Sequence, residues 1–213
     1  MPRDAINAYL IGDVLVDTGI KQSADKIGGM LEGRQISAIA LTHAHNDHAG
    51  AMKDLAGRFG VPIWCGAQDR EAAETGRMVL APAFRRPRLN ALVGATAAFD
   101  GAPVARTLAE GDELAAGFTV LDTPGHSPGH VSFWREADRT LICGDVFFNM
   151  HILTTVPGLR QPPGPFTVNP KQNRDSERKL AELRPSVVGF GHGPVLDKDA
   201  AAKLGDFVAD LPS

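Results

Sequence analysis

The chain has 213 residues, of which 43% are hydrophobic and 22% charged, with a formal net charge of −3. This length suits one domain, so residues 1–213 are interpreted as a single domain, and the hydrophobic content excludes wholesale disorder. The basic residues are scattered, and the nearest approach to a cluster is FRRPR at 84–88, which is too short to indicate a nucleic-acid-binding surface.

The first half of the chain alternates apolar strand patterns with helical ones. Strands are expected at 7–12 and 13–19, joined by a hairpin-like turn at Gly12-Asp13. A helix is expected at 23–34, although Gly28 and Gly29 weaken it. Continuous apolar runs and helical spacing then predict strands at 36–42 and 61–66 and helices at 49–60 and 67–77.

The second half is less regular. Segment 78–101 mixes apolar residues with arginines and prolines, and we expect it to be partly helical, as a lid or pocket wall. Strands are expected at 118–125, 130–136 and 139–145, and the proline-rich segment 150–170 as a long loop. A helix at 174–184, a strand at 186–191 and a closing helix at 197–211 complete a pattern that favours helices packed outside β-sheet.

The chain shows no signal for secretion or membrane insertion. Its start lacks the apolar run and cleavage site of a signal peptide, and no stretch approaches the roughly 20 apolar residues of a membrane-spanning helix. Cys65 and Cys143 each lie in an apolar run, so we expect buried thiols rather than a disulfide. We therefore expect a cytoplasmic protein whose partner is a small-molecule substrate and neither nucleic acid nor membrane. The oligomeric state is open, with a homodimer as one alternative.

Histidine and aspartate recur directly after the predicted strands. The stretch LTHAHNDHAG, at 41–50, holds three of the seven histidines of the chain. Loops at strand ends are where a rigid scaffold presents ligands and catalytic groups. The residues in question are His43, His45, Asp47, His48, His126, Asp145 and His192.

The spacing within this stretch has a geometric meaning. His43 and His45 are two residues apart, so in an extended segment they point to the same side and can share one metal ion. Asp47 and His48 fall where a helix is expected to begin, and the turn can direct them towards a second metal. A helix-face site with ligands at i and i+4 fits only His43 with Asp47, so a loop site is favoured.

These motifs resemble those of a known superfamily. HAHNDH fits the H-x-H-x-D-H motif of the metallo-β-lactamase-fold hydrolases, and TPGHSPGH, CGD and GFGHG resemble the later motifs in the same order. The resemblance spans roughly Asn7 to Gly193 and is greatest with the glyoxalase II-like group of small dinuclear hydrolases. It implies an α/β fold, the four-layer αβ/βα sandwich called the metallo-β-lactamase fold.

The resemblance also implies two metal ions joined by a shared aspartate. The ligands would be His43, His45 and His126 for one metal, Asp47, His48 and His192 for the other, and Asp145 for both. A metal-bridging hydroxide would attack the carbonyl of a small ester, thioester or lactone, because a metal lowers the pKa of water to about 7. Asp47 could also act catalytically by orienting the water or moving its proton. Two Zn²⁺ ions suit a ligand set without cysteine best, with Fe or Mn as alternatives.

Three further residues are interpreted as supporting the site or lying outside it. His130 is expected to support the site rather than bind metal, and His151 to lie at the surface, with a pocket role as the alternative. The DTG at 17–19 matches aspartic proteases, but that chemistry needs two carboxylates sharing a proton. A second DTG is absent. In the resembled family, the aspartate at position 17 supports the metal-binding loop.

The substrate depends on segments outside the metal motifs. Lactonases of the superfamily place a tyrosine near the bridging aspartate, and the single tyrosine here is Tyr9. Glyoxalase II carries an added C-terminal helical region, and little chain remains here after His192, which disfavours a glutathione thioester. The expected pocket lining comprises Phe147, Phe148, Asn149, Met150, the 151–170 loop and the arginines at 85–88.

Two alternatives to a dinuclear hydrolase stay open from the sequence. One is a mononuclear iron persulfide dioxygenase-like oxidoreductase on the same fold, although the arginine-containing stretch that follows the GD motif in such enzymes is not seen. The other is a binding or regulatory protein without turnover. An intact set of clustered carboxylates and imidazoles disfavours the latter, because such groups are costly to bury unless something pairs them.

Overall fold

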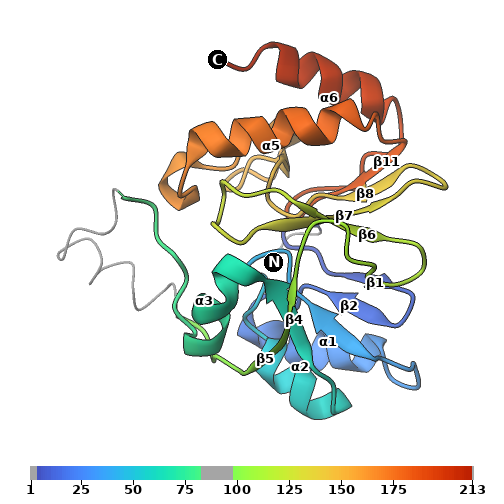
Figure 1. Cartoon of the computed structure of the whole chain (residues 1–213), viewed down its shortest axis with the longest axis vertical. Coiled ribbons are helices and arrows are strands. Elements are labelled where there is room, and N and C mark those ends of the chain that lie inside the picture. The colour runs from blue at the N-terminus through green and yellow to red at the C-terminus, as the bar shows by residue number, and fades with distance from the viewer. Residues whose placement is uncertain (1–3, 83–97, 213) are drawn as a thin grey trace.

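Two β-sheets face each other at the centre of the molecule, as the computed structural model shows for residues 4–82 and 98–212 (Figure 1). The first sheet is parallel except for its β1–β2 hairpin. Its strands, in spatial order, are β1 (Tyr9–Ile11), β2 (Val14–Val16), β3 (Ala38–Ala40), β4 (Ile63–Gly66) and β5 (Val104–Leu108).

The second sheet is mixed, with β11 parallel to β8 and the other neighbours antiparallel. Its order is β11 (Val187–Gly189), β8 (Thr140–Ile142), β7 (Val131–Arg135) and β6 (Thr119–Asp122). A separate antiparallel pair is formed by β9 (Phe148–Met150) and β10 (Pro157–Arg160).

Helices cover the outer face of each sheet (Figure 1). Those on the first sheet are α1 (Ala24–Met30), α2 (Met52–Phe59) and α3 (Arg70–Thr75). Those on the second are α5 (Pro170–Glu182) and α6 (Ala200–Ala209). Short 3-10 turns are η1 (Lys21–Ser23), η2 (Ala67–Asp69) and η4 (Gly164–Phe166).

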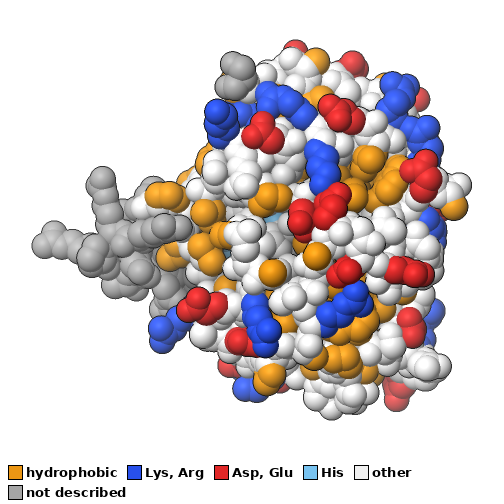
Figure 2. Space-filling model, in the orientation of Figure 1, with side chains coloured by type: hydrophobic (Ala, Val, Ile, Leu, Met, Phe, Trp, Pro, Cys, Tyr) orange, Lys and Arg blue, Asp and Glu red, His pale blue; other side chains and the backbone are white. Residues whose placement is uncertain are grey.

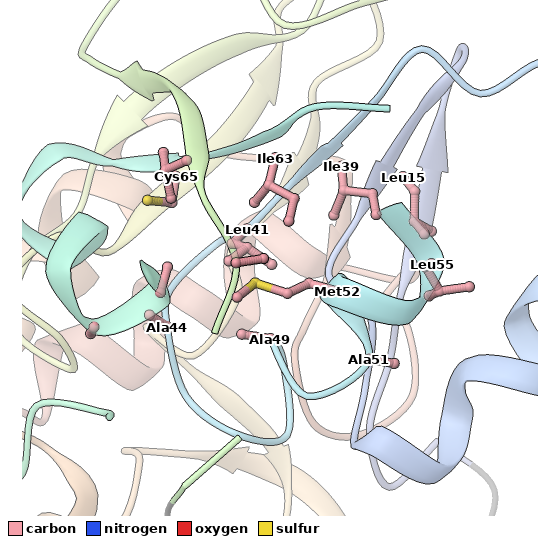
Figure 3. Packing of buried hydrophobic residues seen from close by; sticks show 14 of the residues in the cluster. Leu15, Ile39, Leu41, Ala44, Ala49, Ala51, Met52, Leu55, Ile63 and Cys65 are labelled. Carbon is pink, nitrogen blue, oxygen red and sulfur yellow. The ribbon is translucent and has the colours of Figure 1, made fainter. Parts of the chain in front are cut away.

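Three buried clusters hold these layers together. One joins the first sheet to its helices, where Ile39 and Leu41 meet Met52 and Leu55 of α2 (Figure 3). A second fills the space between the sheets, and a third joins the second sheet to α5 and α6. Each fully buried leucine of this kind contributes about 2 kcal/mol to folding. The expected four-layer α/β sandwich is confirmed.

Several elements were not expected. The strands β5, β9 and β10 were missed, and 150–170 is more than a loop, since it contains β10 and η4. The sequence of β10, PGLR, pairs only with β9 and lacks the β-branched and aromatic residues that mark a strand. The helix expected at 174 begins at Pro170, because proline at the first helical position has its φ already set.

Other expectations concern 78–101, the cysteines and the membrane. The described parts of 78–101 contain no α-helix, while residues 83–97, with the arginines at 85–88, lie outside the described residues. Cys65 and Cys143 are free and buried, as expected. Among residues 4–82 and 98–212, no helix has the length and apolar character needed to cross a membrane.

Candidate metal centre

Four strand ends deliver the predicted site residues to one place. His43 follows β3 of the first sheet, whereas His126, Asp145 and His192 follow β6, β8 and β11 of the second. Asp47 and His48 lie in the turn before α2. The site therefore lies where the two sheets end together, and it needs both.

The side chains form three overlapping groups whose nitrogen and oxygen atoms lie within 4.8 Å of one another. Such separations are short enough for one ion to contact all members of a group. The groups are His43, His45 and His126; His43, His48 and Asp145; and Asp47, His48 and His192. The seven residues are called the ligand cluster below.

Asp145 lies at the centre of the ligand cluster. One oxygen, Oδ2, is surrounded by the Nε2 atoms of four imidazoles. The distances are 3.8 Å to His43, 3.4 Å to His48, 3.3 Å to His126 and 3.3 Å to His192. A carboxylate with imidazoles on several sides is suited to contact two ions at once.

Polar atoms in this cluster lack the partners that buried groups normally have. His43 Nε2, His45 Nε2 and Asp145 Oδ1 are buried without a hydrogen-bond partner. Imidazole nitrogens and carboxylate oxygens without cysteine form a donor set for Zn, Fe or Mn. The residues therefore fit a pair of divalent cations.

The pKa values of the cluster imidazoles shift in two directions, downward for His43 and upward for His192. Burial and the neighbouring His48 and His45 hold the pKa of His43 well below its ordinary value. Burial also lowers the pKa of His192, but the carboxylates of Asp145 and Asp47 outweigh it and raise the value to about 10. Because metal binding requires the neutral imidazole, a cation would displace a proton at His192.

A cavity of about 240 Å³ opens beside the ligand cluster. It is lined by His45, Asn46, Asp47, Met78, His126, Asp145, Phe148, Ile152, Phe166 and His192. Figure 2 shows a small area of histidine surface near the middle of this face, with hydrophobic side chains beside it. The cluster is therefore accessible to a small molecule.

The expectation for the pocket lining is confirmed in part. Phe148 lines the cavity, as do two residues of the 151–170 segment. Phe147 instead packs in the core, and Asn149 Nδ2 donates to the Pro194 carbonyl at 2.8 Å. Neither these two residues nor Met150 is part of the lining. Along β9 the side chain of Asn149 points to the face opposite that of Phe148, whereas Met150 is buried on the same face as Phe148 without reaching the cavity.

The family model described as the metallo-beta-lactamase superfamily matches residues 1–192. The chain belongs to the metallo-β-lactamase superfamily. The order of its motifs and the four-layer architecture agree with this membership.

Similar proteins are found among both sequences and structures. "Probable metallo-hydrolase YflN" of Bacillus subtilis (strain 168) is 30% identical over 94% of this chain and 83% of that protein. A hydroxyacylglutathione hydrolase of Bdellovibrio bacteriovorus is 30% identical, over 54% of this chain and 36% of that enzyme. The crystal structure of TTHA1623 in a di-iron-bound form is 30% identical, with a TM-score of 0.68 over 96% of this chain and 93% of that one. Together with the ligand cluster, these relatives support a metallo-hydrolase.

Asp17 supports the superfamily's first motif, as expected. Its backbone adopts a left-handed conformation, with φ 58°, which aspartate tolerates better than most residues. Its carboxylate accepts hydrogen bonds from the Thr42 amide at 2.8 Å and hydroxyl at 2.7 Å. It also lies 2.8 Å from His48 Nδ1, so it orients that ring with Nε2 towards the cluster.

His130 also has the supporting role that was expected. Its Nε2 accepts a hydrogen bond from the Asp145 amide at 3.0 Å, and its Nδ1 lies 2.9 Å from the Thr123 hydroxyl. Burial lowers the pKa of His130 to about 3, which keeps the ring neutral and Nε2 free to accept. His130 thus positions the backbone of Asp145.

Asp69 was missed by sequence reasoning. Its Oδ2 accepts from the Ala44 amide at 2.9 Å and the Ser127 hydroxyl at 2.6 Å, while Oδ1 accepts from the Gly129 amide at 2.7 Å. One buried carboxylate thereby ties the loop of His43 and His45 to the loop of His126. No motif marks Asp69, which stands in a sequence that indicates an ordinary helix, and only its burial identifies it.

Gly191 provides space that the cluster requires. A Cβ at this position would collide with the Asp145 carboxylate and the His48 ring. The glycine of the GFGHG motif therefore allows the backbone to pass directly against two members of the ligand cluster.

Proposed function

We propose that the protein is a dinuclear metal-dependent hydrolase that acts on the carbonyl of a small ester, thioester or lactone. The observation that carries the proposal is the position of Asp145, whose carboxylate is shared between imidazoles of both metal-binding groups. Hydrolysis adds water across the acyl C–O or C–S bond, so the hydroxyl joins the acyl carbon and the proton joins the leaving oxygen or sulfur.

The assignment of ligands follows the three overlapping groups. His43, His45 and His126 would hold one cation, Asp47, His48 and His192 the other, and Asp145 both. When bound, the cations supply Lewis-acid chemistry, which lowers the pKa of water and polarises a carbonyl. Zn²⁺ is proposed, with Fe and Mn as alternatives, and the di-iron form of TTHA1623 supports including iron.

Asp47 is the member of the cluster best placed to handle a proton. Its side chain is 26% exposed, whereas that of Asp145 is 3% exposed, and it lines the cavity. Burial opposes ionisation, but the charges of His48 and His192 outweigh it and hold the pKa of Asp47 well below its ordinary value. Asp47 is therefore a carboxylate near neutral pH, able to accept a hydrogen bond from water and orient it, and we propose it also as the group that moves the proton of that water.

The arginine-containing stretch that follows the GD motif in mononuclear iron persulfide dioxygenases is not seen in this sequence, which favours this proposal over that oxidoreductase. Asp47, His48 and His192 provide a second set of candidate ligands within 4.8 Å of one another. The cavity that reaches both groups likewise favours turnover over a binding role.

The experiment combines metal analysis with a substrate screen. The protein is reconstituted separately with Zn²⁺, Fe²⁺ and Mn²⁺, its metal content is measured by mass spectrometry, and ester, thioester, lactone, phosphodiester and β-lactam substrates are tested. We expect two equivalents of metal and turnover of carbonyl substrates. Turnover of phosphodiesters alone, or iron-dependent O₂ consumption with one metal per chain, would overturn the proposal.

A further inference from the structure

Four of the side chains that line the cavity are hydrophobic, and one of them lies directly against the ligand cluster. The Phe148 ring lies 4.4 Å from the His192 ring, between centroids. Together with three other residues it forms what is called the apolar wall below. The apolar wall comprises Met78, Phe148, Ile152 and Phe166.

The apolar wall continues onto the surface through the β9–β10 hairpin. The turn of this hairpin is closed by the His151 amide donating to the Val156 carbonyl at 2.9 Å. Ile152 is 40% exposed, Leu153 85% and Val156 55%. A group of exposed hydrophobic side chains beside a site is characteristic of a binding surface.

The described lining of the cavity contains hydrophobic side chains and the ligand cluster, but no lysine or arginine. Among the described residues that line it, the charged side chains other than histidine are Asp47 and Asp145, and none is lysine or arginine. An anionic substrate would therefore find no side-chain cation of the described lining, whereas an alkyl group would find four hydrophobic residues next to the ligand cluster.

On the basis of the proposed hydrolase function, we propose that the substrate carries an alkyl chain beside its scissile carbonyl. The carbonyl lies at the ligand cluster, the first methylenes contact Phe148, and the alkyl chain leaves the cavity past the exposed Ile152 and Phe166. The alkyl chain belongs either to the acyl group or to the leaving group of the substrate, because both would present the same methylenes to the cavity.

Two series of esters test the proposal on the metal-replete protein. In one, the acyl group of a 4-nitrophenyl ester grows from acetyl to decanoyl, and in the other the alkyl group of an acetate ester grows over the same range. We expect kcat/KM to rise about two- to fourfold per methylene in one series, up to hexyl or octyl, since burial of each methylene is worth about fourfold. A flat or falling profile in both series would overturn the proposal.

Variants of the apolar wall localise the effect. Ile152→Ser and Phe166→Ser should each reduce the ratio of kcat/KM between octyl and two-carbon substrates about fivefold. A general structural defect would lower both values and leave the ratio unchanged, and that result would count against the proposal. The matched control is Met30→Ser, an exposed methionine of α1, which should retain the wild-type ratio.

A binding measurement separates this inference from the proposed function. Alkyl methyl ketones of three to nine carbons carry the carbonyl and chain but cannot be hydrolysed. Calorimetry on the metal-replete protein should show affinity rising with chain length, and Ile152→Ser should flatten that rise. Absence of ester turnover alongside this rise would remove the hydrolase function alone. Ester turnover with ketone affinity independent of length would remove the apolar-chain inference alone.

Discussion

The ligand cluster and the apolar wall lie against the same cavity but are held in opposite ways. The cluster residues His43, His48 and Asp145 are buried, and three buried side chains outside the cluster fix their loops through hydrogen bonds. The wall ends in a hairpin turn whose hydrophobic side chains are exposed. Under the two proposals above, the reaction would depend on the buried ligand cluster, and substrate selection on a surface segment that can change without disturbing the core.

The largest expected effect comes from removing the centre of the ligand cluster. Asp145→Ala should lower metal content and reduce carbonyl hydrolysis by more than the roughly 10–100-fold typical for loss of a residue that merely supports a metal ligand. Metal analysis and steady-state kinetics measure both. The control is Asp206→Ala, an exposed position of α6. Full metal content with wild-type kinetics in Asp145→Ala would show that this carboxylate binds no metal.

Asp69→Ala tests whether the ligand cluster depends on a residue outside it. The substitution leaves the donors of Ala44, Ser127 and Gly129 without their acceptor. Each unsatisfied buried donor costs about 1–3 kcal/mol, so we expect the free energy of unfolding to fall by about 3 kcal/mol or more. Urea denaturation measures it.

The matched control for this experiment is Asp54→Ala, since Asp54 is an exposed aspartate of α2. Its unfolding free energy should stay within about 0.5 kcal/mol of the wild type. Equal stabilities of the Asp69→Ala and Asp54→Ala proteins would contradict the supporting role of Asp69.

The same contrast explains how much could be predicted from the sequence. The ligand cluster was readable because its residues stand in short motifs directly after apolar strands, and because the order of these motifs resembles that of a known superfamily. Asp69 could not be found in this way, since its partners lie 25 to 60 residues away along the chain.

The missed strands have a related cause. The five residues of β5, VARTL, alternate in burial, but the central residue of the inward-facing set is Arg106, so the sequence lacks the apolar alternation that marks a strand. The three-residue β9 and the PGLR of β10 gain their strand geometry from pairing with each other rather than from propensity. The hairpin that carries Phe148 and Ile152 thus rests on backbone pairing that residue propensity does not reveal.

Glu177 of α5 connects the two regions and should make stability depend on pH. Its carboxyl group accepts hydrogen bonds from Gln161 Nε2, directly after β10, at 3.1 Å and from Asn173 Nδ2 at 3.2 Å. Asn173 Nδ2 also donates to the Val146 carbonyl, next to Asp145, at 3.1 Å. Burial raises the pKa of Glu177 from 4.5 to about 7.

Because the folded-state pKa is raised, the stabilising contribution of neutral Glu177 is complete below pH 4.5 and is lost as the pH rises through about 7. Glu177→Gln keeps the shape without the charge. We expect it to match the wild type near pH 4 and to exceed its unfolding free energy by up to about 3 kcal/mol at pH 8.5. Urea denaturation across this range measures the difference, with the exposed Glu182→Gln of the same helix as control. Parallel pH profiles for wild type and Glu177→Gln would contradict this.

The smallest effect on stability is expected from a substitution at the tip of the β9–β10 hairpin. Leu153 is 85% exposed, so Leu153→Ser should change the free energy of unfolding by less than about 0.5 kcal/mol. Thermal or urea denaturation measures it. A loss of unfolding free energy comparable to that of Asp69→Ala would show that the hairpin supports the fold as strongly as the loops of the ligand cluster do. That result would contradict the contrast between the ligand cluster and the apolar wall.

The most direct test of the account is the number and position of metal ions in a crystal of the reconstituted protein, located by anomalous scattering. The account predicts two peaks, one in contact with His43, His45 and His126, the other with Asp47, His48 and His192, and Asp145 between them. A single peak, or peaks away from these side chains, would contradict it.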